Sequence, residues 1–456
     1  MRILADHALL PGGWARNVAV TISADGYILQ VQPDAVPVAD ETRVAGPLVP
    51  GMPNLHSHAF QRALAGRTGR AVASGGGTGS FWTWRAAMYA FLDRVDPDGF
   101  EAIATQCYVE MLKAGYTSVA EFHYVHNDPR GWAYTDPAEL AHRVVAGAKR
   151  AGIALTLLPV FYAHSGFGGA EPTAGQRRFV HTLESYARLV ARLAGDAGEH
   201  GYVLGVAPHS LRAVTPDELA AIVALAPAGA PIHIHVAEHV QEVSDCVTAL
   251  GGRPVEWLLR NVRVDSQWCL VHATHMTSEE VARLANSGAV TGLAPTTEAD
   301  LGDGVFAARN YLRRGGAFGI GSDSNTAVDP FAELRQLELT QRLFRLERNV
   351  LAGSTLPVGQ FLYELAAAGG ARALAQPVGV ISRGARADLV VLNADDPALV
   401  AQPVDDVIDA AIFGPCRQPV RDVMVAGRWV VRDGHHPGER AALAAYRAAL
   451  ARLATA

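Results

Sequence analysis

The sequence predicts an α/β protein made of a (β/α)8 TIM-like barrel and a second, smaller β-sandwich domain. From Pro50 to about Gly370, short apolar runs with strand character alternate with helix-like segments. Each run carries polar, reactive side chains at its C-terminal end, which is the face of such a barrel where active sites are built. The two ends of the chain instead contain short alternating runs separated by turns, a pattern typical of antiparallel strands.

The predicted barrel strands follow one another at regular intervals along the middle of the chain. They are expected at residues 48–58, 117–125, 154–163, 202–210, 231–238, 268–275, 289–297 and 318–324. Between them lie segments such as PAELAHRVVAGAKRAG and TPDELAAIVALA, which combine helical periodicity with acidic first turns. Strands and helices that alternate eight times are the pattern of a (β/α)8 barrel.

The flanks divide the chain into four predicted parts. Residues 1–49 and 379–435 are expected to pair into one β-sandwich, interrupted in sequence by the barrel at 50–378. Residues 436–456, which include ERAALAAYRAALARLA, are expected to form a closing helix. The glycine-rich segment 71–79, AVASGGGTG, is expected to be a loop, and it precedes a segment that could close over a substrate as a lid.

Composition excludes several classes of protein. The chain of 456 residues is 49% hydrophobic and 18% charged, values typical of a globular protein, and its net charge of −6 comes without a basic stripe. Nucleic acid and anionic membranes are therefore not expected as partners. The cysteines are widely spaced and form no CxxC pair, which argues against a disulfide framework and a thiolate zinc site. Without a signal-like apolar core or a bilayer-length apolar run, a cytoplasmic protein is expected.

Histidines and one aspartate at three strand ends predict a metal site. His56 and His58, in NLHSHAF, end the first strand, and strand alternation places both side chains on the same side. His235 ends the fifth strand in HIHVAEH, and Asp323 ends the eighth in GIGSDSN. Three imidazoles and one carboxylate are a ligand set suited to Zn²⁺, with a further position left for water.

Two further residues would make such a site hydrolytic. Glu238 follows His235 by three residues, near enough to move a proton without binding the metal, and His272 ends the sixth strand in LVHATH. A water on Zn²⁺ has its pKa lowered to about 7, so a neighbouring carboxylate and imidazole could deprotonate it and pass the proton to a leaving nitrogen.

A second group of polar residues is expected at the same mouth of the barrel. Arginine guanidinium groups bind carboxylates with two parallel hydrogen bonds, so this group predicts a pocket for an anionic substrate. A purine or triazine ring would instead require stacking aromatic rings and amide donors. The group consists of Gln61, Arg85, Tyr124, His209 and Arg212.

The arrangement of HxH on strand one, histidines on strands five and six, and aspartate on strand eight resembles the amidohydrolase superfamily. Many binuclear members bridge two metals with a carboxylated lysine on strand four or three, but Lys113 and Lys149, the two lysines of this chain, fall in helical segments. The HVAE pattern is shared with the mononuclear deaminases and chlorohydrolases. The resemblance therefore implies one Zn²⁺ per subunit.

Within that superfamily, the segments NLHSHAFQRALAGR, FWTWR, EFHYVHND, APHSLRAV and HIHVAEH resemble the formimidoylglutamate deiminases. This resemblance implies zinc-dependent hydrolysis of N-formimidoyl-L-glutamate to N-formyl-L-glutamate and ammonia in histidine degradation. It implies His56, His58, His235 and Asp323 as zinc ligands, with Glu238, His272 and Asp323 as catalytic residues. The polar group of Gln61, Arg85, Tyr124, His209 and Arg212 would bind the glutamate part of this dicarboxylate. The resemblance also implies a homodimer.

Two alternatives remain open at this point. One is a mononuclear deaminase or chlorohydrolase that acts on an aromatic N-heterocycle resembling guanine or a triazine; it shares the metal ligands but does not require the pair Arg85 and Arg212. The other is a non-catalytic barrel that serves as a scaffold, although such proteins tend to lose ligands and none is missing here.

Overall fold

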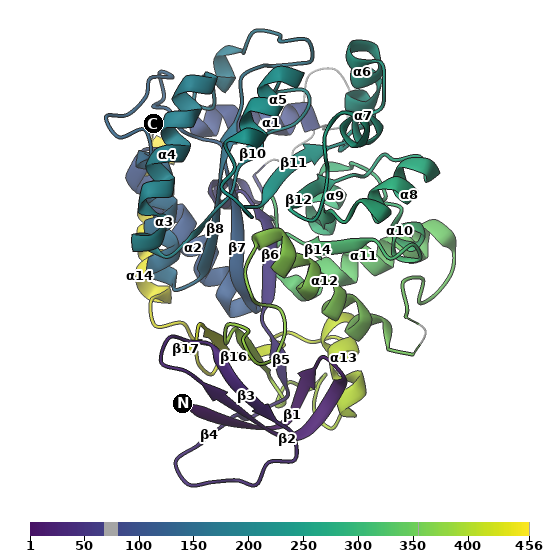
Figure 1. Ribbon diagram of the computed structural model, residues 1–456. Coiled ribbons are helices and arrows are strands. Elements are labelled where there is room, and N and C mark those ends of the chain that lie inside the picture. The colour runs from purple at the N-terminus through teal and green to yellow at the C-terminus, as the bar shows by residue number, and fades with distance from the viewer. Residues whose placement is uncertain (68–80, 354, 456) are drawn as a thin grey trace.

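The computed structural model describes residues 1–67, 81–353 and 355–455, and it confirms the barrel with a smaller sheet at one end (Figure 1). The predicted loop 71–79 lies outside the described residues. The limits predicted for the individual domains stay a prediction. Among the described helices, no segment combines the length and the apolar character that a bilayer span requires.

Parallel strands form the wall of the barrel in two arcs. Neighbouring strands within each arc are hydrogen-bonded in parallel. The first arc contains β6 (Met52–Ser57), β7 (Tyr116–His123), β8 (Ala154–Phe161), β9 (Val203–Leu204) and β10 (Ala207–Pro208). The second contains β11 (Ile232–Val236), β12 (Trp268–His272), β13 (Val290–Leu293) and β14 (Ala317–Ile320).

Isolated parallel bridges join the two arcs into a closed barrel. Val206 pairs with Ile232 and Ser210 with His235 at one seam, while Ser57 pairs with Asp323 at the other. The strands are buried on both faces, as is usual when helices cover a parallel sheet. The closed ring brings the C-terminal ends of all its strands to one rim.

Two predicted strands are divided in the structure. The first, predicted at 48–58, is β5 (Leu48–Pro50) followed by β6, because the chain turns from the small sheet into the barrel at Gly51. The Cβ of any larger residue at Gly51 would lie 2.3 Å from Thr117 Cγ2. The fourth, predicted at 202–210, is interrupted between β9 and β10. The apolar runs do not reveal these interruptions, because both halves of each strand are buried.

Helices follow the strands and cover the outside of the barrel (Figure 1). The longer ones have a half-exposed, half-buried pattern, as surface helices do. The helices of this part of the chain, long and short, are α1 (Phe81–Leu92), α2 (Pro97–Ala114), α3 (Glu139–Ala151), α4 (Leu183–His200), α5 (Pro216–Ala224), α6 (Val240–Leu250), α7 (Pro254–Asn261), α8 (Ser278–Ser287), α9 (Pro295–Leu301), α10 (Ala308–Leu312), α11 (Pro330–Arg345) and α12 (Val358–Leu374). Short 3-10 turns occur at Ala59–Leu64, Ala174–Gln176 and Val404–Asp406.

Local sequence signals set the limits of these helices. Before α5 and α8, Thr215 and Thr277 form reciprocal capping boxes with Glu218 and Glu280. Proline at the first helical position begins α5, where its missing N–H has no intrahelical partner to lose. At the end of α2, Gly115 takes the left-handed conformation, with φ of 103°, that terminates many helices.

Strands from both ends of the chain build the smaller sheet. Its order is β17-β16-β15-β5-β1-β2-β3, with β4 beside β1, so N-terminal and C-terminal strands meet where β5 pairs antiparallel with β15. The remaining members are β1 (Arg2–Leu10), β2 (Gly13–Ile22), β3 (Ile28–Gln32), β4 (Thr42–Arg43), β15 (Leu389–Leu392), β16 (Val420–Val425) and β17 (Arg428–Val431). Because β5 leads directly into β6, this sheet is anchored at the base of the barrel.

Two C-terminal helices complete the chain. The short helix α13 (Val407–Phe413), which the sequence patterns did not predict, packs against α11 and α12. The predicted closing helix is present as α14 (Glu439–Thr455) and packs against α2 on the outside of the barrel (Figure 1). Its Tyr446 donates a hydrogen bond to the Arg62 carbonyl at 3.4 Å, in the turn after the first barrel strand.

A pair of glycines lets α12 lie directly against the barrel strands that carry the site. A Cβ at Gly369 would lie 1.8 Å from the Phe318 carbonyl oxygen of β14, and one at Gly370 would lie 2.9 Å from Pro53 Cβ of β6. Both neighbours belong to strands, so neither can move aside without shifting the barrel wall. Close approach therefore requires glycine at both positions.

We expect Gly369→Ala to lower the free energy of unfolding by about 2–3 kcal/mol, because the added methyl group overlaps main-chain atoms. Gly195→Ala is the matched control: it lies on the exposed face of α4 with no atom within 4 Å of its added Cβ. In the control, the better helix propensity of alanine should leave stability unchanged or raise it by about 0.5–1 kcal/mol. Denaturant unfolding compares the two, and equal midpoints would contradict this account of the helix–strand contact.

Candidate active site

Three histidines meet at the rim of the barrel. His56 lies near the end of β6, His58 just after it, and His235 in β11, and all three are buried. The Nε2 atoms of His56 and His235 are 3.1 Å apart. One ring nitrogen from each of the three histidines lies within 4.8 Å of the others. The predicted strand ends therefore do converge.

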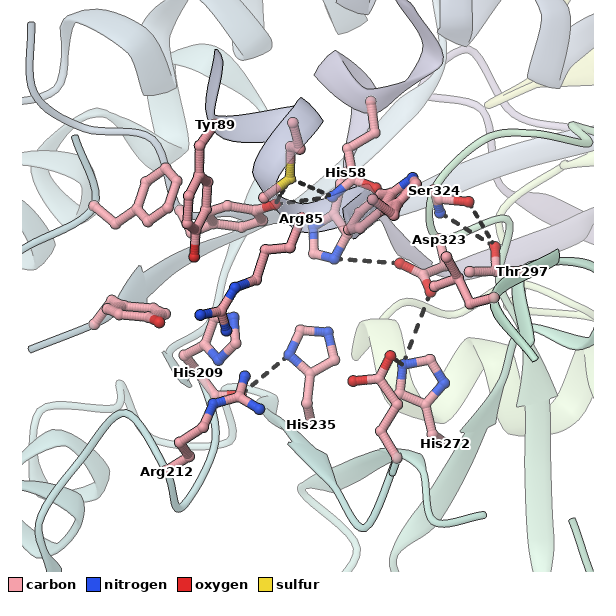
Figure 2. A pocket seen from close by; sticks show the side chains of 18 residues that line it. His58, Arg85, Tyr89, His209, Arg212, His235, His272, Thr297, Asp323 and Ser324 are labelled. Atoms are coloured by element: carbon pink, nitrogen blue, oxygen red, sulfur yellow. Dashed lines mark hydrogen bonds and ion pairs between the residues drawn. The ribbon is translucent and has the colours of Figure 1, made fainter. Parts of the chain in front are cut away.

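Asp323 joins this group through the seam that closes the barrel. Its Oδ1 lies 3.6 Å from His56 Nε2 and 3.3 Å from His58 Nε2. Its backbone adopts φ of 42°, a left-handed value that non-glycine residues rarely take. Backbone strain of this kind is stored at functional sites and costs roughly 1–3 kcal/mol per residue, which the surrounding structure offsets. Here it turns the carboxylate back toward the histidines (Figure 2).

The ring orientations fit a divalent metal of the zinc type. His58 Nδ1 donates to the Phe122 carbonyl at 2.9 Å and His235 Nδ1 donates to the His209 carbonyl at 3.1 Å. Each such bond fixes the tautomer that leaves Nε2 as a lone-pair donor. Burial lowers the pKa of His56 to about 3 and also lowers the pKa values of His58 and His235, so the rings are neutral. Neutral imidazoles beside one carboxylate are the state in which Zn²⁺ is bound.

His272, the last residue of β12, lies among three carboxylates. Its Nε2 is 3.7 Å from Glu238 Oε1 and 3.8 Å from Asp323 Oδ2. On the other side, Nδ1 donates to Glu298 Oε1 at 3.3 Å. Burial acts to lower the pKa of His272, but the carboxylates, Glu238 first, raise it to about 10. The ring is thus held as a donor whose Nε2–H points toward the space between Glu238 and Asp323.

The main chain at Glu238 is fixed by a second carboxylate. A buried carboxylate four residues later, Glu242, accepts the N–H groups of Ala237 at 2.9 Å and Glu238 at 3.0 Å. Ala237 has φ of 51°, so the chain turns sharply between His235 and Glu238. This turn explains how two residues only three apart can face the cavity with different roles.

The predicted anion-binding residues line the same cavity. Gln61 Nε2 donates to Tyr124 Oη at 2.8 Å, and Gln61 Oε1 is buried without a hydrogen-bond donor among the described residues. The Arg85 guanidinium lies over the Tyr89 ring, 5.5 Å from its centroid. Figure 2 shows Arg85 and Arg212 reaching toward the same region from opposite walls, next to His209. The guanidinium groups of Arg85 and Arg212 thus face the same part of the cavity, away from the Asp323 carboxylate.

One cavity gathers nearly all of the predicted site residues. Its lining includes every member of the predicted set except His56, which lies beneath it in contact with His235: His58, Gln61, Arg85, Tyr124, His209, Arg212, His235, Glu238, His272 and Asp323. The sequence patterns did not identify the other lining residues, which include Met88, Tyr89, Tyr162, Phe179, Thr297 and Ser324.

Glu298 and Glu242 are functional candidates that the sequence patterns missed. Both are buried acids, and each accepts main-chain N–H groups: Glu298 from Ala294 at 3.1 Å, Glu242 from Ala237 and Glu238. Glu298 lies one residue beyond the end predicted for strand seven, in APTTEAD. In the structure β13 already ends at Leu293, and Glu298 lies in the first turn of α9. Its place near the predicted strand end is a signal that could have marked it, whereas Glu242 looks like an ordinary helix-start acid.

Comparison with known proteins agrees with this geometry. The amidohydrolase family matches residues 48–430, and a domain described as the N-terminal domain of formimidoylglutamate deiminase HutF matches residues 1–45. A formimidoylglutamate deiminase of Pseudomonas aeruginosa is 52% identical over 445 residues, 97% of each chain.

Solved structures extend the likeness. An amidohydrolase from Brucella melitensis has a TM-score of 0.94 and 47% identity, with 99% of each chain covered. An adenosine deaminase from Xanthomonas campestris with bound zinc has a TM-score of 0.82 and 24% identity, covering 100% of this chain and 98% of its own. The second of these is too distant in sequence to indicate more than the shared fold.

We expect His235→Asn to lower the affinity for Zn²⁺ at least about 100-fold, because loss of a direct ligand costs more than the 10- to 100-fold typical of residues that only orient one. The control is His435→Asn, whose ring is exposed near the start of α14. Metal content after dialysis against a weak chelator measures the difference. Retention of a full equivalent by His235→Asn would remove this residue from the ligand set.

Proposed function

Because this chain belongs to the amidohydrolase family and groups within it with the formimidoylglutamate deiminases, we propose that it converts N-formimidoyl-L-glutamate and water to N-formyl-L-glutamate and ammonia. The chain is a hydrolase that acts on a carbon–nitrogen bond. In this proposal the reaction is a step of histidine degradation.

The division of charge within the cavity is the observation that carries the proposal. Arg85 and Arg212 face one part of the space, whereas Asp323 and His272 face the other. Glu238 belongs to the second part, because its Oε1 lies 3.7 Å from His272 Nε2. Formimidoylglutamate has the complementary arrangement, with two carboxylates at one end and a protonated amidine at the other. A neutral aromatic ring carries no anionic group that the two guanidinium groups could bind through paired hydrogen bonds.

We assign one Zn²⁺ per subunit to His56, His58, His235 and Asp323, on the basis of their convergence and the neutral state of the rings. An ion in this position supplies a water whose pKa is lowered to about 7, so that a nucleophile is available at neutral pH. The proposal of zinc rather than another divalent ion rests on the nitrogen-rich ligand set.

The remaining steps belong to side chains of the cavity. Glu238 takes a proton from the attacking water and delivers it to the departing amino group. Two observations support this role: Glu238 lines the cavity, and its Oε1 lies 3.7 Å from His272 Nε2. His272 donates through Nε2 to the oxygen that is added to the formimidoyl carbon, and Glu298 keeps the ring in that orientation. Asp323 and His272 together orient the water before it attacks.

The two arginines and their polar neighbours bind the glutamate part of the substrate in this proposal. We assign its carboxylates to Arg85, Arg212, His209, Tyr124 and Gln61, all of which line the cavity. The Gln61–Tyr124 hydrogen bond leaves Gln61 Oε1 available to accept from an amidine N–H of the substrate. Burial lowers the pKa of His209 well below its usual value, so it acts as a neutral hydrogen-bonding group.

We also propose a cytoplasmic homodimer and the domain limits given above. Turnover of an intermediate of amino-acid degradation takes place inside the cell, which supports the location. Exposed apolar side chains at the end of α11, Leu343, Phe344 and Leu346, are 78%, 66% and 91% exposed and are candidates for a subunit contact.

The proposal is tested by ammonia release from a panel of substrates and, for the chlorotriazine, by chloride release. We expect turnover of formimidoylglutamate and none of guanine, a chlorotriazine or S-adenosylhomocysteine, because only the first carries two carboxylates. Activity confined to a ring substrate would overturn the proposal in favour of an aromatic deaminase or chlorohydrolase. Absence of turnover together with absence of bound transition metal would support a non-catalytic scaffold.

Arg212→Met should lower kcat/KM for formimidoylglutamate by roughly 10- to 150-fold, since hydrogen bonds to charged groups contribute about 1.5–3 kcal/mol each. Arg212→Lys, which keeps the charge but loses the two-pronged hydrogen-bonding geometry, should fall between this variant and the wild type. Arg188→Met on the exposed face of α4 serves as the control. Loss of zinc from Arg212→Met would show that Arg212 holds the site together instead of the substrate.

A further inference from the structure

A second cluster of potential metal ligands lies directly behind Glu238. His239 is the residue before α6, and Asp303 follows the glycine that ends α9. His239 Nδ1 is 3.1 Å from Asp303 Oδ1, and His239 Nε2 is 3.4 Å from Glu238 Oε1. The imidazole therefore lies between two carboxylates, one of which is the proposed proton carrier.

Asp303 is a buried carboxylate with few hydrogen-bond donors around it. Its side chain is 0% exposed, and apart from His239 no hydrogen-bond donor among the described residues reaches either carboxylate oxygen. Burial, together with the nearby charge of Glu238, raises the pKa of Asp303 to about 6. Buried carboxylates normally have several donors, so two of them sharing one imidazole leave room for a further cation.

The geometry and the chemistry of these three groups suit zinc. One ligand atom from each of Glu238, His239 and Asp303 lies within 4.8 Å of the others. Ligands on a tetrahedral Zn²⁺ with bonds of about 2.0–2.2 Å stand roughly 3.4 Å apart, which falls within the 4.8 Å range of these atoms. Two carboxylates and one imidazole are a set that binds borderline divalent ions. The His239 side chain is 15% exposed, which gives the ion a route from solvent.

We propose that Glu238, His239 and Asp303 form a second Zn²⁺ site, weaker than the histidine-rich one, at which excess zinc inhibits the enzyme. An ion there occupies the carboxylate of Glu238, which can then no longer accept and return a proton. The inhibition rests on the function proposed above for Glu238, whereas the binding of the ion does not. With three protein ligands instead of four, the site fills only after the first.

The binding experiment measures zinc stoichiometry on protein that already holds one equivalent. Titration with free Zn²⁺ at fixed, buffered concentrations should reveal a second equivalent in the wild type. Asp303→Asn, which is isosteric, should weaken this second binding at least about tenfold and leave the first unchanged. His239→Gln is the second variant and should do the same. Asp300→Asn, which removes an exposed carboxylate three residues away, is the matched control and should keep both equivalents.

The turnover experiment uses the same zinc concentrations with formimidoylglutamate. Wild type and Asp300→Asn should lose at least about tenfold in kcat as the second equivalent binds, while Asp303→Asn and His239→Gln should keep their activity. Equal inhibition of all four proteins, or a second equivalent that persists in both ligand variants, would overturn the proposal. A protein that binds the second equivalent as expected but never hydrolyses formimidoylglutamate would instead contradict the proposed function and leave the zinc site standing.

Discussion

The main-chain pairing between the first and last barrel strands is the contact on which the site depends. His58 N donates to the Asp323 carbonyl at 2.9 Å, and Asp323 N donates to the His56 carbonyl at 3.0 Å. These two bonds close the barrel and bring the proposed ligands from opposite ends of its sequence together. Asn325 reinforces the seam, because its Nδ2 donates to the carbonyls of His58 and Asp323, both at 3.0 Å. A buried amide of this kind rigidifies its surroundings only while every partner is present.

The sequence predicted the barrel well because its signal is repeated. A run of buried apolar residues followed by a polar residue occurs at each strand, and the parallel topology requires those polar residues to share one rim. The interruption of the first strand at Gly51 could not be predicted in the same way, because β5 and β6 are equally buried although they belong to different sheets. Which sheet a buried strand joins is decided by tertiary pairing, here with β15 and β7.

Within the site, residues with distinctive chemistry were predictable and their supports were not. His235, His272 and Asp323 carry side chains that can bind metals or transfer protons. Their joint occurrence at the ends of buried strands therefore indicated a site. Glu298 and Glu242 act through hydrogen bonds to the His272 ring and to main-chain N–H groups. Those bonds depend on a turn geometry, such as φ of 51° at Ala237, that nothing in the local sequence specifies. Aromatic residues such as Tyr89 and Phe179 are equally compatible with a hydrophobic core.

The charge distribution also explains why a linear, doubly charged substrate and this metal site belong together. Three carboxylates, Glu238, Glu298 and Asp323, lie around His272 and raise its pKa to about 10. Such a concentration of negative charge favours cations. In the proposed function the protonated amidine binds at that end and Arg85 and Arg212 bind the carboxylates. The same field also favours divalent ions, which agrees with the second metal site inferred above.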